Sequence, residues 1–215
     1  MNKKIIICLL LILLCGCHVT KETDCQKFKS EYEQYNGKKD DNGLTYVEVN
    51  ISDNSKIKYA EKDKLYEIMT NGTHVVYLGW STCPYCRLCV PILLDTIDEY
   101  SGISMYYYNI KEMRESYIIQ DDDSNLYKQI SDLVLNSCPE AETFEKYDDG
   151  TLKLPASTFY FIKDGNIIGL HRGTVESHLN VYEELDDQQI EELKNIYRNY
   201  LNEMIKKDPI GCSEC

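Results

Sequence analysis

The hydrophobic positions along the chain alternate between strand-like and helix-like spacing. Residues 74–80 are an apolar run rich in β-formers, which predicts a buried central strand. The full set of predicted strands covers residues 44–51, 74–80, 103–110, 158–162 and 166–170. The last two flank Asp164-Gly165 and therefore predict a β-hairpin.

Apolar residues at helical spacing fill the gaps between these strands. Helices are predicted over residues 24–35, 60–70, 84–100, 125–136 and 187–206. Strands and helices alternate in the first half, whereas a hairpin and a helix end the second half. The chain therefore predicts an α/β fold with a mixed sheet and helices on both faces.

The first residues have the pattern of an export signal. A basic start precedes ten apolar residues, too few to span a hydrocarbon core of roughly 30 Å. The sequence Leu14-Cys15-Gly16-Cys17 then resembles a bacterial lipobox, in which Cys17 receives the lipid. We expect an exported protein anchored by this lipid on the outer face of the cell membrane, and an ordinary cleaved signal peptide is the alternative.

These patterns divide the chain into segments. We expect a signal peptide at residues 1–16, a tether with a docking helix at 17–43, a main domain at 44–207 and a cysteine-containing tail at 208–215. A helical insertion is expected within the main domain at residues 111–153, beside the rim of the site and before the C-terminal hairpin.

Composition and charge narrow the class of protein. Hydrophobic residues make up 43% and charged residues 27% of 215 residues, which fits a folded chain. Its 23 basic and 36 acidic residues give a net charge of −13, which argues against nucleic-acid binding. We expect a monomer. The ten cysteines suggest an oxidising compartment or thiol chemistry.

Cys83-Pro84-Tyr85-Cys86 lies where the central strand passes into a helix. The free N–H groups and dipole of a helix N-terminus favour an anion, so we expect the pKa of the Cys83 thiol to be lowered. Cys83 would then be the nucleophile, and Cys86 would resolve the mixed disulfide. Pro84 suits the first helical turn, where its missing N–H is not needed.

Residues 83–93, with Pro91, resemble the active-site helix of the thioredoxin superfamily, and residues 159–168 resemble its hairpin. The resemblance covers about residues 44–206. The subgroup to which the chain is most similar comprises thioredoxin-like lipoproteins and bacteriocin-transport accessory proteins of Gram-positive bacteria. This resemblance implies a thioredoxin-like mixed sheet, and protein thiols or disulfides as substrates. It also implies an unidentified redox partner, and no cofactor or metal. The residues that would position the substrate are Trp80, Pro84, Tyr85 and Pro155.

Three positions depart from that family. Thr82, not Trp, precedes the first cysteine, and Tyr77 stands where the family has the buried Asp that accepts the proton of the resolving cysteine. The family's cis-proline would fall at Ser157, two residues after Pro155. We expect Pro155 to fill the role through a bulge, with Ser157 as the alternative. The Thr-Val-Pro element of glutaredoxins is absent, so glutathione dependence is not expected.

Other interpretations of these cysteines stay open. The domain could be a binding or export-accessory lipoprotein without catalysis, since fold alone does not establish activity. An iron–sulfur site that included Cys89 would need a fourth cysteine where Leu93 stands, and a zinc site would need Cys212 and Cys215.

The remaining cysteines predict a tie between the chain's ends. Cys89 is expected to be a buried free thiol, and one tail cysteine is expected to pair with Cys25 or Cys138. A Cys212–Cys215 disulfide is the alternative.

Overall fold

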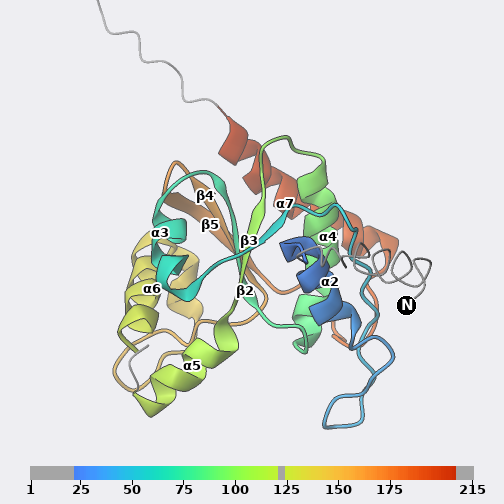
Figure 1. Cartoon of the computed structure of the whole chain (residues 1–215), viewed down its shortest axis with the longest axis horizontal. Coiled ribbons are helices and arrows are strands. Elements are labelled where there is room, and N and C mark those ends of the chain that lie inside the picture. Colours follow the sequence, from blue (N-terminus) through green and yellow to red (C-terminus); the bar gives the residue numbers. More distant parts are fainter. Residues whose placement is uncertain (1–21, 121–123, 207–215) are drawn as a thin grey trace, which may run out of the picture.

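The computed structural model describes residues 22–120 and 124–206. Its sheet has the strand order β1-β3-β2-β4-β5, in which β1 and β2 run parallel to β3, and β4 runs antiparallel to both β2 and β5 (Figure 1). The strands are β1 Ile57–Tyr59, β2 His74–Gly79, β3 Met105–Asn109, β4 Thr158–Lys163 and β5 Asn166–Arg172. The central strand is β2, as its apolar run predicts.

Helices cover both faces of the sheet. They are α2 Asp24–Glu33, α3 Leu65–Thr70, α4 Pro84–Asp98, α5 Ile110–Ile119, α6 Ser124–Ser137 and α7 Asp187–Ile205, with short 3₁₀ turns at Lys62–Lys64 and Pro139–Thr143. In Figure 1, α2, α4 and α7 lie on one side of the sheet, and α3, α5 and α6 lie on the other. The predicted α/β class with a mixed sheet between helices is confirmed, and this arrangement is compatible with a thioredoxin-like sheet.

The side chains of β2 point alternately to the two faces of the sheet and so contribute to two separate hydrophobic cores. Val75 and Tyr77 point toward α2, α4 and α7, whereas Val76 and Leu78 point toward the opposite helices. All four side chains are fully buried. This strand ends just before the Cys-x-x-Cys motif, so both cores fix the position of the motif.

The predicted hairpin joins β4 to β5. Asp164 and Gly165 both have positive φ, at 49° and 79°. A Cβ atom at Gly165 would lie 2.4 Å from the carbonyl oxygen of Thr70, so the turn needs glycine for space as well as for conformation.

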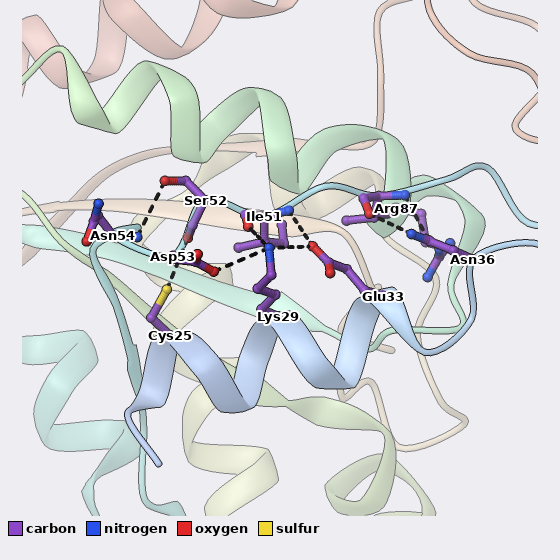
Figure 2. A network of polar contacts seen from close by, with 10 residues as sticks. Cys25, Lys29, Glu33, Asn36, Ile51, Ser52, Asp53, Asn54 and Arg87 are labelled. Carbon is purple, nitrogen blue, oxygen red and sulfur yellow. Dashed lines mark hydrogen bonds and ion pairs between the residues drawn. The ribbon is translucent and has the colours of Figure 1, made fainter. Parts of the chain in front are cut away.

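The strand predicted at residues 44–51 is wrong. This segment is extended, but its polar groups are bound by side chains of α2 and the loop after it, as Figure 2 shows. Asn36 bonds both the N–H and the C=O of Val49, at 2.9 and 2.8 Å. Glu33 accepts from the N–H of Ile51, and Lys29 donates to its carbonyl. Because these bonds satisfy the backbone, the segment does not join the sheet, and β1 takes the edge.

The predicted docking helix, α2, is part of the main core. Phe28 and Tyr32 are fully buried, and their rings stack with centroids 4.4 Å apart. Cys25 in its first turn donates to the carbonyl of Ser52 (Figure 2). The residues after Thr23 therefore belong to the folded body.

The segment between β3 and β4 covers one face of the sheet with α5 and α6. The hydroxyl of Tyr127 donates to the carbonyl of Leu152 and accepts from the N–H of Leu154, both at 2.9 Å. Ser131 accepts from the N–H of Leu152 at 2.8 Å. These buried bonds tie α6 to the strand-like stretch before β4.

The predicted signal segment and Cys17 lie outside the described residues. Among the helices that are described, none is both long enough and apolar enough to cross a membrane.

Candidate active site

The Cys-x-x-Cys motif begins where β2 gives way to α4. Cys83 is the N-cap residue of α4, with extended backbone angles, and Pro84 is the first helical residue. The N–H of Cys83 donates to the carbonyl of Trp80 at 3.1 Å, which closes the turn between strand and helix. The helix continues through Pro91, as the sequence predicts.

The two thiols have opposite environments. The pKa of Cys83 is lowered, chiefly by a hydrogen bond from the Cys86 thiol, although burial acts in the opposite direction. The backbone N–H groups of Cys86 and Tyr85 lower this pKa further, and so does the positive charge of Arg114. Those N–H groups favour the thiolate without making a regular cap bond to the sulfur. Cys83 is 8% exposed, whereas Cys86 is fully enclosed and burial raises its pKa well above the ordinary value. This is the asymmetry that a nucleophile and a resolving thiol require.

Cys83 opens into a cleft of about 550 Å³. The cleft brings together four of the residues predicted from the sequence, namely Trp80, Cys83, Tyr85 and Pro155. Tyr85 is 45% exposed at the rim, whereas Pro84 begins α4 and is not part of the lining. A side chain or extended peptide can therefore reach the Cys83 sulfur from solvent.

The sequence did not predict the charged wall of this cleft. Its charged residues come from α5, from the stretch before β4, and from β5 and the loop after it: Arg114, Glu145, Lys153, Arg172 and Glu176. The guanidinium of Arg114 lies 5.8 Å from the ring centre of Trp80. Only the tertiary fold brings these residues to the motif, because no local pattern in the sequence links them.

The expectation of a cis-proline at Pro155 is wrong. All peptide bonds among the described residues are trans, although Pro155 and Ala156 do line the cleft. Ser157 is the unusual residue here, since it is buried and has a φ of 57°. Its carbonyl accepts from the N–H of Gly173 at 3.0 Å, which holds this stretch against the end of β5.

Cys89 is a core thiol. Its side chain is fully buried, and burial raises its pKa to about 12. Its polar neighbours are the hydroxyls of Ser157 and Tyr197. Within residues 22–120 and 124–206, no three His, Cys, Asp or Glu side chains form a group that could hold a metal ion.

Cys25 and Cys138 are free, buried thiols in the described structure. Cys212 and Cys215, one of which is predicted to pair with Cys25 or Cys138, lie outside the described residues. The tie between the chain's ends therefore stays a prediction.

Replacing Arg114 by glutamine should raise the pKa of Cys83, because the positive charge at the cleft favours the thiolate. Alkylation of Cys83 by iodoacetamide should then reach its plateau at a higher pH than in the parent chain. Lys64→Gln is the control, since Lys64 pairs with Glu67 away from the cleft. An identical pH profile for Arg114→Gln and the parent would contradict this electrostatic role.

A scan against protein-family models finds no match for this chain, and a search of curated proteins finds none either.

Proposed function

We propose that this protein is a thiol–disulfide oxidoreductase that acts on protein thiols or disulfides. One observation carries the proposal: Cys83, whose pKa is lowered, caps a helix in an open cleft, with the enclosed thiol of Cys86 one turn further along. A buried structural cysteine pair would not need an open approach to one sulfur.

In the first step, the Cys83 thiolate attacks one sulfur of a substrate disulfide. A Cys83–substrate bond forms, and the other substrate sulfur leaves as a thiolate that takes a proton from water. In the second step, Cys86 loses its proton and attacks Cys83. The Cys83–Cys86 bond forms, the substrate sulfur is released, and the substrate has gained two electrons. The reverse sequence oxidises a substrate dithiol.

The lining of the cleft supports a protein substrate. Tyr85 offers an exposed aromatic ring beside the nucleophile, and Arg114 and Arg172 bring positive charge to a cleft in a chain of net charge −13. An extended loop that carries a cysteine could lie against Pro155 and Ala156. We further propose that the lipid on Cys17 holds this cleft at the outer face of the membrane.

A redox titration tests the function. The chain is equilibrated in glutathione buffers of graded potential, and the Cys83–Cys86 disulfide is quantified by alkylation and mass spectrometry, with insulin reduction measured alongside. We expect a reversible two-electron transition and turnover of insulin in the presence of dithiothreitol. Absence of both would reject catalysis and would favour the alternative, a binding module on the same fold.

A further inference from the structure

Two buried tyrosines, whose hydroxyls bond each other, lie in the same core cluster as Cys86. Tyr77 on β2 and Tyr32 on α2 are both fully buried, and their hydroxyl oxygens lie 2.5 Å apart. The Tyr77 ring lies over Gly79, where an added Cβ would come within 2.2 Å of its hydroxyl oxygen. The hydroxyl therefore stands at the end of β2, beside the Cys-x-x-Cys turn and in the same buried cluster as Cys86, where it favours the thiolate of Cys86.

The second step of exchange makes this contact important. Cys86 must become a thiolate in a fully enclosed site, and an unpaired charge there is costly. No carboxylate is among the main influences on the pKa of Cys86, which come from burial, Cys83, Tyr77 and the N–H of Trp80. Glu31 on α2 is occupied by the hydroxyls of Tyr107 and Tyr59. Arg87, the next residue on α4, bonds three carbonyls and Asn36 instead.

We propose that Tyr77 stabilises the thiolate of Cys86 during resolution of the mixed disulfide, and that Tyr32 orients the Tyr77 hydroxyl for this task. The inference rests on the exchange function proposed above. Tyr77 acts as a hydrogen-bond donor, and Tyr32 is a positioning residue.

The proton count of the pair fits this role. Each hydroxyl carries one proton, and either oxygen can be the donor in their mutual bond. In the mixed disulfide, where Cys83 no longer accepts from Cys86 as a thiolate, the Cys86 thiol donates to Tyr77, and Tyr77 donates to Tyr32. When Cys86 has lost its proton to water, Tyr32 donates to Tyr77, and Tyr77 donates to the sulfur. The chain of bonds reverses while every heavy atom keeps its place.

Burial raises the pKa of both tyrosines well above the ordinary value, so both stay protonated and available as donors. Tyr32 is held at its other end as well, because its carbonyl accepts from Arg87 at 2.8 Å. Tyr107 supplies a matched control. Its ring stacks on Tyr77 with centroids 5.3 Å apart, but its hydroxyl bonds Glu31 at 2.6 Å.

The test separates the two steps of exchange with 5,5′-dithiobis(2-nitrobenzoate) as the disulfide. Attack by Cys83 releases the first thionitrobenzoate, and resolution by Cys86 releases the second, so stopped-flow absorbance gives two phases. Tyr77→Phe should slow the second phase about 10- to 100-fold, the rate equivalent of one hydrogen bond to a charged group, and should move its pH midpoint upward. The first phase should change little.

Tyr32→Phe should give a smaller change in the same direction, and Tyr107→Phe should leave both phases at the parent rates. An unchanged second phase in Tyr77→Phe, or equal slowing in Tyr107→Phe, would overturn the proposal. A parent chain that shows no first phase would instead reject the exchange function. The effect of Tyr77 on Cys86 can also be measured without exchange, in a chain that carries Cys83→Ser. In that background, Tyr77→Phe should raise the pKa of Cys86, which is measured from the pH dependence of its ¹³Cβ chemical shift. An unchanged pKa there would equally overturn it.

Discussion

Replacing Cys83 by serine is expected to lower the rate of disulfide exchange on the order of 10³-fold or more, to the background of the assay. A hydroxyl at this position cannot form the mixed disulfide, and Cys86 cannot replace it because Cys86 is fully enclosed. Insulin reduction with dithiothreitol, compared at equal concentrations of parent and variant, measures the loss.

Two further cysteine variants make the result specific. Cys86→Ser should keep the attack by Cys83 and accumulate a mixed disulfide with the substrate, visible on non-reducing gels. Cys89→Ala should keep the parent rate, because Cys89 is a core thiol whose pKa of about 12 leaves it protonated. Full activity in Cys83→Ser would reject the mechanism.

Arg87→Leu is expected to destabilise the fold by about 3–5 kcal/mol. Arg87 is 1% exposed, and its guanidinium donates to the carbonyls of Val47, Tyr32 and Ser81. It also donates to the side chain of Asn36 at 2.6 Å (Figure 2). Leucine would take this donor from the carbonyls of Val47 and Ser81, and unpaired buried acceptors cost about 1–3 kcal/mol each. Asn36 Oδ1 and the Tyr32 carbonyl would each lose one of two donors. Urea unfolding followed by circular dichroism measures the change.

Arg198→Leu is the matched control for this prediction. Arg198 makes a comparable set of bonds to Glu99, Glu191 and Asn195, but these lie at the surface, on α7 and at the C-cap of α4. Surface ion pairs of this kind contribute about 1 kcal/mol or less. If the two arginine variants lost similar stability, the burial argument for Arg87 would be wrong.

The carbonyl of Ser81 links the buried hydrogen bonds of Arg87 to the candidate active site. Its carbonyl belongs to the turn between Trp80 and Cys83, and the Arg87 that binds it follows Cys86 directly. The Arg87 side chain therefore ties the segment after α2 to the turn that carries Cys83.

Local patterns predicted the parts of the molecule that local interactions build. The position of Cys83 at a strand-to-helix junction follows from the apolar run before it and from Pro84, which is favoured in the first helical turn. The hairpin at Asp164-Gly165 likewise follows from two residues that accept positive φ.

The errors arose where partners lie far apart in the sequence. Alternation at residues 44–51 indicates an extended chain, but it does not reveal whether a strand or the side chains of Asn36 and Glu33 will satisfy the backbone. The charged wall formed by Arg114 and Lys153 depends on how α5 and the stretch before β4 fold back. The sequence showed Tyr77 as a difference from the family that the chain resembles, but not its hydrogen bond with Tyr32, 45 residues earlier.

The sheet order also sets the sequence of events when the chain is made. β2 needs β4 beside it, with Val75 opposite Phe161, and Tyr197 of α7 packs against Phe159. The chain is synthesised from its N-terminus onward, and strand pairings between residues that are distant in the sequence form late in folding. Cys83 and Cys86 therefore emerge while the strands and helix that enclose them are still unmade. The difference in reactivity between the two thiols therefore arises only once β4 has paired with β2 and α7 has packed against β4.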